Sequence, residues 1–336
     1  MQRSTRRYII QRLIQWAIVV FVGITVAFII PRLTPMDPVQ RMMAQIQATG
    51  QFMSQEALMD LRHSLETLYG TTGTLLEQYG RFWGDLLRFN LGPSLSQFPR
   101  PVTQVIGQAL PYTLGLMGLA TVIAWVLGLI LGSLTGYFYN RKWARALDVA
   151  IMVIYPIPYY IMAFLLLMVF AYIFPIFPRG GAAGIGVRPG FTWLFISQTV
   201  RHGFLPALSL VIVGLGWRFL SMKAIAATVV GSDYVAYAEA GNLPKRKILV
   251  NYVIRNSMLP QVTDLALSLG VIFSGTLITE VVFTYPGLGR VLYTAILQGD
   301  FNLIMGITVF SVVAIATAAL IVDLTYPLFD PRIRYN

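Results

Sequence analysis

Long apolar runs, separated by shorter stretches that hold most of the charge, dominate this chain of 336 residues. A helix needs roughly 20 apolar residues to cross the hydrocarbon core of a bilayer. Six stretches meet that requirement, so we predict an all-α polytopic membrane protein with six transmembrane helices. The stretches are 13–31, 113–138, a part of 149–178, a run that begins near 205, 259–284 and 301–322.

Two apolar features need a separate interpretation. The run 191–200 is too short to span, so we interpret it as an interfacial or re-entrant segment. The run 13–31 follows three arginines, as the apolar core of a signal peptide does, but it is long for such a core. Pro31-Arg32 also stands where a signal peptide has a small-residue cleavage site. We therefore treat 13–31 as the first span.

The composition agrees with a membrane protein. Hydrophobic residues make up 56% of the chain and charged residues 12%, whereas about 25% of a soluble domain is charged. The net charge of +11 would suggest nucleic-acid binding in a soluble protein. Here the basic residues lie between apolar runs, so we expect a lipid bilayer and no nucleic acid as the partner. Cysteine is absent and the two histidines are far apart, so no metal site is predicted.

The distribution of Lys and Arg predicts the orientation, because short cytoplasmic loops are enriched in both. With the N-terminus inside, fifteen basic residues fall in short inner segments and four in short outer loops. We therefore predict that both termini are cytoplasmic. The four outer residues are Arg179, Arg188, Arg201 and Arg290.

The polar segment after the first span is predicted to be a small helical layer outside the membrane. Residues 54–69 carry leucines at helical spacing behind Ser54, a residue type that caps helices, and 75–89 form a second amphipathic pattern. These helices either cap the bundle or form a docking surface around Tyr79, Trp83 and Leu91. The predicted division is 1–33 (tail and first span), 34–111 (outer segment) and 112–336 (five-helix core).

The inner loop before the fifth span has the most distinctive pattern. A short helical run, 233–240, meets Gly241-Asn242, and both residue types tolerate a left-handed conformation. A basic patch and a second helix ending at Pro260 follow. The pattern predicts a helix–turn–helix along the cytoplasmic face, although an ordinary basic loop would also fit the composition.

This loop resembles the EAA loop of ABC importer permeases, in the form found in B-type subunits of dipeptide and oligopeptide permeases. Other stretches agree in order and spacing, so the resemblance covers essentially the whole chain. They include Leu33-Thr34-Pro35-Met36-Asp37-Pro38, Glu280-Val281-Val282-Phe283, Tyr285-Pro286-Gly287-Leu288-Gly289 and Asp330-Pro331-Arg332. Asn242 departs from the pattern, because the family usually has a glycine there; Met36 and Asn90 depart too.

The resemblance implies a type I ABC importer permease in a bacterial or archaeal cytoplasmic membrane. It implies a second homologous permease, two cytoplasmic ATPase subunits that use ATP and Mg, and an extracytoplasmic solute-binding protein; this chain would hold no cofactor. Peptides are the expected cargo, with nickel and oligosaccharides left open. The ATPase-coupling loop would lie within 229–260, at Tyr237, Ala238, Glu239, Ala240, Gly241, Asn242, Leu243 and Pro260.

Polar residues inside the predicted fifth span are candidates for the transport path. Asp264, Ser268, Gly275 and Thr279 repeat at helical spacing, which predicts one face of a helix. That face either lines the path or packs as a polar seam against neighbouring helices. Glu280 and Asp323 are predicted to form structural pairs near the membrane boundary, and Asp148 is predicted to pair with Arg145.

The chain carries no catalytic constellation, such as a His-Glu-x-x-His helix or a Gly-x-Ser-x-Gly elbow. It also lacks a phosphate-binding loop, so we predict a transport subunit and no enzyme. The alternative is a secondary transporter driven by an ion gradient, which would show inverted repeats and paired broken helices. An intramembrane hydrolase would need paired aspartates, and those present are isolated in sequence.

Overall fold

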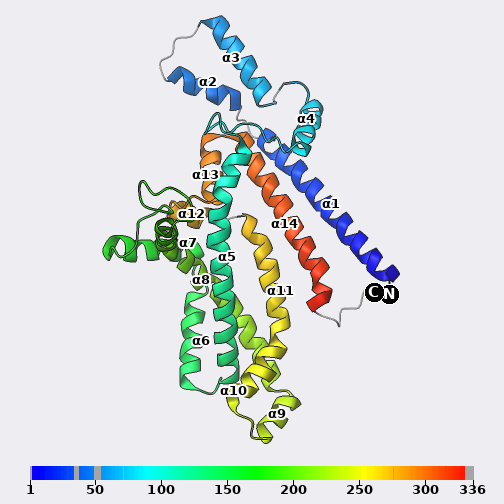
Figure 1. Cartoon of the computed structure of the whole chain (residues 1–336), viewed down its shortest axis with the longest axis vertical. Helices are drawn as coiled ribbons and strands as arrows, with labels where there is room; N and C mark the ends of the chain where they lie inside the picture. Colours follow the sequence, from blue (N-terminus) through cyan, green and yellow to red (C-terminus); the bar gives the residue numbers. More distant parts are fainter. Residues whose placement is uncertain (1, 34–37, 49–53, 71, 275, 330–336) are drawn as a thin grey trace.

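The computed structural model describes residues 2–33, 38–48, 54–70, 72–274 and 276–329, as helices joined by turns (Figure 1). Four helices in this part of the chain are long and apolar enough to cross a membrane. They are α1 (Gln2–Leu33), α5 (Val102–Tyr137), α8 (Trp193–Val230) and α14 (Phe301–Phe329). The predicted all-α class with several apolar spans is confirmed.

A bent helix pair supplies a fifth candidate span. Helix α6 (Lys142–Ile154) is followed by α7 (Tyr159–Leu167) and a π-helical turn to Ile173, and the two parts meet at 97°. Pro156 and Pro158 lie at the bend. Proline has no amide hydrogen to donate and disfavours helical geometry in the residue before it. The third apolar stretch therefore changes direction within its length.

Helix α8 begins earlier than the sequence predicts. Thr192 Oγ1 accepts a hydrogen bond from the Phe195 amide at 3.3 Å, and the helix then continues through Pro206 to Val230. Its 38 residues correspond to about 57 Å. The interpretation of 191–200 as a segment separate from the fourth span was wrong, because residues 193–200 form the first turns of α8. An interfacial position for these turns stays a prediction.

The predicted fifth span, 259–284, is not one continuous helix. Helix α11 (Arg255–Val271) ends in a 3₁₀ turn, and α12 (Leu277–Val282) begins after Thr276, whose backbone is non-helical. Helix α12 then packs against α7 and against α13 (Leu288–Gln298). The count of six spans therefore stays a prediction.

Helices α5 and α8 form the most extensive helix pair. Gly128, Gly132 and Gly136, spaced four residues apart, lie on the face of α5 that contacts α8. A methyl group at Gly132 would lie only 2.7 Å from the Phe219 carbonyl oxygen. Small residues at this spacing let two backbones approach closely, as is common between membrane helices.

Helices α1 and α14 form a second pair. Ile24 and Ala27 of α1 pack on Val309 of α14. At the other end of the pair, the Arg12 guanidinium lies 3.2 Å from the Asp323 carboxylate. The predicted structural pairing of Asp323 is therefore confirmed.

Three helices form a layer beyond the C-terminal end of α1: α2 (Pro38–Ala48), α3 (Gln55–Leu68) and α4 (Leu75–Leu87). Helices α3 and α4 confirm the two predicted amphipathic patterns, and Ser54 caps α3 as predicted. Helix α5 starts at Val102, inside the predicted outer segment 34–111.

The predicted docking surface on α4 and the segment after it is partly covered by the chain itself. Trp83 stacks on Phe21 of α1 with ring centroids 5.7 Å apart, and Tyr79 meets Phe28 edge-on at 5.1 Å. Leu91 packs against a buried cluster that includes residues of α5 and α14. These contacts leave Tyr79, Trp83 and Leu91 half-buried. The expectation that their face lies near a docked binding protein stays a prediction.

Candidate functional site

The segment between α8 and α11 forms a compact arm at one end of the molecule, far from α3 (Figure 1). It consists of α9 (Asp233–Ala240), α10 (Lys245–Ile248) and a π-helical turn, Leu249–Ile254. We call residues 231–254 the α9 arm. The short helix predicted at 233–240 is confirmed with the same bounds.

The chain reverses direction after α9 at Asn242, the residue that departs from the family pattern. Asn242 adopts φ +54°, while Gly241 has φ −73°. The Leu243 amide donates to the Ala238 carbonyl at 3.2 Å, and the Asn242 amide donates to the Glu239 carbonyl at 2.9 Å. This is a Schellman turn, in which asparagine replaces the usual glycine at the left-handed position. Only one of the two residues predicted to permit the turn needs the left-handed conformation.

The sequence predicted that the second helix of the loop ends at Pro260, and this prediction was wrong. Pro260 lies inside α11, which continues to Val271. Proline removes one backbone hydrogen bond from a helix, and here the helix continues past that loss. Pro260 is thus separated from the turn after α9 by α10 and the π-helical turn.

One face of α9 anchors the arm to the bundle. Val235 and Ala238 are buried against Ile248 and Val253, in a cluster that also includes Ala226 of α8. Burial of such apolar side chains contributes roughly 1.5–3 kcal/mol for each large one. The arm is therefore a packed extension of the bundle.

The other face of α9 and the turn after it are exposed. Tyr237 is 78% exposed, and Glu239, Ala240, Gly241 and Asn242 are also exposed. The Tyr137 hydroxyl of α5 donates to Glu239 Oε1 at 3.2 Å. The tip therefore presents one large aromatic ring beside small residues and a carboxylate that is already hydrogen-bonded to the bundle.

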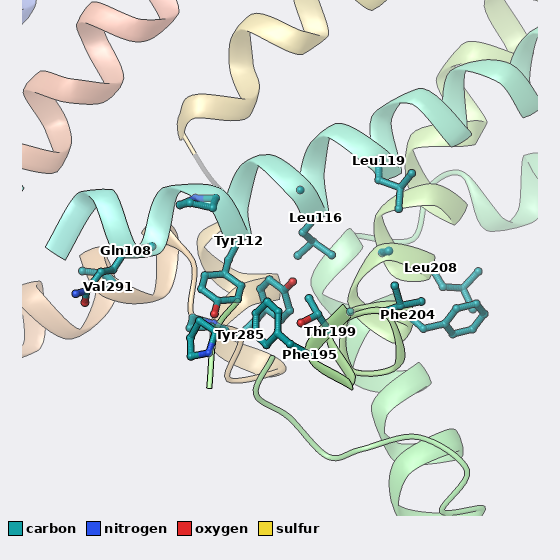
Figure 2. Close-up of a pocket in the computed structure, with 18 of the residues that line it drawn as sticks. Gln108, Tyr112, Leu116, Leu119, Phe195, Thr199, Phe204, Leu208, Tyr285 and Val291 are labelled. Atoms are coloured by element: carbon teal, nitrogen blue, oxygen red, sulfur yellow. The ribbon is translucent and has the colours of Figure 1, made fainter. Parts of the chain in front are cut away.

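A cavity of about 1130 Å³ lies between α5, α8 and the segment that precedes α13. Figure 2 shows Tyr112 and Tyr285 beside each other, with Phe195 and Thr199 directed toward them. The described residues that line the cavity include no Lys, Arg, Asp or Glu. Polar groups in its wall include the hydroxyls of Tyr112, Thr199 and Tyr285 and the amide of Gln108.

Asp264, Ser268 and Thr279, which were predicted to line the path, are not in the wall of this cavity. Asp264 lies 3.2 Å from Arg218 of α8, and Arg218 also donates to Ser268 Oγ at 2.8 Å. Thr279 is buried on α12, beyond the helix break, and Gly275 lies outside the described residues. The prediction of one face on one continuous helix was wrong, because α11 ends at Val271.

The ion pair predicted between Asp148 and Arg145 was also wrong. Asp148 Oδ2 lies 2.5 Å from Lys223 Nζ of α8. Helix α6 packs against α8, and this packing brings together two charges that are 75 positions apart in the sequence.

Comparison with known proteins identifies the family. The family described as "Binding-protein-dependent transport system inner membrane component" matches residues 128–335 of this chain, which include the α9 arm and most of the bundle. The chain belongs to this family. It is an inner-membrane permease component of a binding-protein-dependent transport system.

Individual relatives of this permease are similar along nearly their whole length. The oligopeptide transport system permease protein AppB of Bacillus subtilis is 28% identical over 98% of this chain and 99% of its own. The dipeptide transport system permease protein DppB of the same organism is 28% identical, over 98% of both chains. The probable D,D-dipeptide transport system permease protein DdpB of Escherichia coli is 32% identical over 95% of each chain.

Sequence reasoning on this permease missed the cavity. Its wall combines α5, α8 and the Tyr285-Pro286 segment, which are far apart in the chain. One available signal was the motif around Tyr285-Pro286-Gly287, which the resemblance singled out and to which no role was attached.

Proposed function

We propose that this permease is one of two membrane subunits of an ATP-driven peptide importer. The observation that carries the proposal is the α9 arm, a packed helix with a small-residue tip at one end of the bundle, in a chain of this family. Peptide cargo is supported by the relatives AppB and DppB, which are named for oligopeptide and dipeptide transport. Membership of a binding-protein-dependent family argues against a secondary transporter.

We propose that the exposed tip of the arm docks on a cytoplasmic ATPase subunit. Tyr237, Glu239, Ala240, Gly241 and Asn242 would form the contact, while Ala238 and Leu243 anchor the arm from behind. ATP and Mg would be used by two such partner subunits. Pro260 lies inside α11, far from the tip along the chain. It would affect docking only through the direction in which α11 runs.

We propose that the cavity is this subunit's half of the translocation path. Leu119, Ile123 and Leu127 line the cavity and are also exposed along α5, so the cavity is open on that side. A second homologous permease on this stripe would close the cavity between two subunits. Uncharged walls with a few hydroxyls and amides suit peptides of varied sequence better than a metal ion. Asp264, Ser268, Gly275 and Thr279 remain predicted path residues.

We expect cysteine labelling to place the layer after α1 outside the cell and the loop after α5 inside it, as the six-span topology requires. The chain has no native cysteine, so single substitutions report cleanly. Met59→Cys on exposed α3 should react with an impermeant maleimide in intact cells. Lys142→Cys, exposed at the start of α6, should react only after permeabilisation. The reverse pattern would refute the orientation. Labelling of both sites in intact cells would refute the span count between them.

We expect the purified chain alone to show no ATPase activity. None of its lysines (Lys142, Lys223, Lys245 and Lys247) completes a Gly-x-x-x-x-Gly-Lys-Ser/Thr loop, which binds the phosphates of a nucleotide in many ATPases. The measurement is phosphate release by the single subunit, with the complete transporter as the positive control. Saturable hydrolysis by the subunit without its partners would contradict the proposal.

A further inference from the structure

A fully buried carboxylate lies next to the cavity and has no role in the function proposed above. Glu280 of α12 is completely shielded from solvent. Among the described residues, no Lys or Arg side chain forms an ion pair with it. A buried charge without compensation is costly, so the groups that stabilise it indicate its purpose.

Those groups come from the start of α13 and from α5. The Arg290 amide donates to Glu280 Oε2 at 3.1 Å, and the Thr113 hydroxyl of α5 donates to Glu280 Oε1 at 2.8 Å. The Leu288 amide donates in turn to Thr113 Oγ1 at 2.8 Å. The first turn of a helix has unpaired amides and a partial positive charge. Glu280 and Thr113 together therefore cap α13, which begins after Gly287, a residue without a capping side chain.

The two neighbouring glycines make room for the carboxylate. A methyl group at Gly287 would lie 2.3 Å from Glu280 Oε2, and one at Gly289 would lie 2.6 Å from the Leu277 Cα. Larger residues at either position would push the amides of α13 away from the carboxylate. The Gly-Leu-Gly sequence that begins at Gly287 thus matches a carboxylate cap supplied from α12.

The capped segment forms part of the cavity wall. Tyr285, Pro286 and Val291 line the cavity around the start of α13 (Figure 2). The Tyr285 amide donates to the Glu280 carbonyl at 2.7 Å, and its ring meets Tyr112 edge-on at 5.9 Å. Tyr112 precedes Thr113 on α5, so the cap and the wall share the same two elements.

We propose that Glu280 is a positioning residue of the permease. With Thr113, its carboxylate holds the start of α13 and thereby fixes the wall formed by Tyr285, Pro286 and Val291 against α5. This role rests on the proposed function of the cavity as a path. Without the carboxylate, the wall moves relative to α8 and the path loses its shape, while the α9 arm and its docking surface stay unchanged.

The test measures movement of that wall in the assembled transporter. A cysteine replaces Val291 on α13 as the reporter, and in a separate variant one replaces Leu208 on α8, on the opposite wall. Glu280→Gln and Thr113→Val should each accelerate maleimide labelling at position 291 by about tenfold, as expected for loss of one charge-assisted hydrogen bond. Labelling at 208 should stay within about twofold of the parent. Thr113→Ser keeps the hydroxyl and should restore slow labelling at 291.

Other labelling patterns contradict the proposal. Unchanged labelling at 291 would show that the wall does not depend on the cap. Equal acceleration at 291 and 208 would indicate a general loosening of the bundle, as would failure of both variants to assemble. The labelling does not depend on the cargo. Slow labelling in the parent and fast labelling in the variants, in a transporter that takes up no peptide, would therefore refute the proposed function and leave the positioning role intact.

Discussion

Ala240→Trp is expected to abolish association of the permease with its ATPase while leaving the membrane bundle folded. Ala240 is exposed at the end of α9, beside Gly241 and Asn242, where the side chains of the tip are small. An indole ring there would prevent a groove on the partner from closing around the helix. The measurement is co-purification of the ATPase with the variant, together with ATP hydrolysis stimulated by loaded binding protein; both should fall to background.

Two companion variants separate docking from other effects. Val250→Trp places the same indole ring at an exposed position of the arm away from the tip, and it should retain the ATPase. Glu239→Ala should weaken docking only mildly, because an exposed ion pair contributes about 0–1 kcal/mol. Normal ATPase binding and normal stimulation in the Ala240→Trp variant would show that the arm is not the coupling element.

Gly132→Leu is expected to destabilise the permease by at least about 3 kcal/mol, at the upper end of overpacking effects. The first added carbon would meet the Phe219 carbonyl oxygen at 2.7 Å and the Met222 Cβ at 2.8 Å. A carbonyl oxygen of a helix backbone cannot rotate away as a side chain does, so the whole of α8 would have to shift. Thermal unfolding of the detergent-solubilised subunit measures the loss.

Gly118→Leu is the matched control, because it makes the same change on the same helix. Apart from the local backbone of α5 and the two neighbouring residues, no atom lies within 4 Å of the position that a methyl group at Gly118 would occupy. This variant should keep the unfolding temperature of the parent subunit. If both variants unfold like the parent, close packing between α5 and α8 does not stabilise the fold. If both are equally destabilised, glycine matters to α5 itself rather than to its contact with α8.

The sequence by itself determined the features that depend on local pattern. Apolar runs of sufficient length predicted α1, α5 and α14, because lipid requires about the same run of apolar residues wherever a helix spans. Ser54 predicted the start of α3, since a serine side chain caps a helix through bonds to its own neighbours. The bounds of α9 followed from a short helical run that stops at residues suited to a turn.

Residue pairs between distant parts of the chain were decided only by the tertiary structure. Asp148 pairs with Lys223 rather than with nearby Arg145, because α6 packs against α8. Asp264 and Ser268 contact Arg218 for the same reason, because the packing of α11 on α8 brings these side chains together. The break after Val271 lies close to Ser274-Gly275, a dipeptide typical of turns, but the packing of α12 on α7 and α13 decides where the chain goes after it. Helical spacing specifies which residues share a face, but only packing specifies what that face meets.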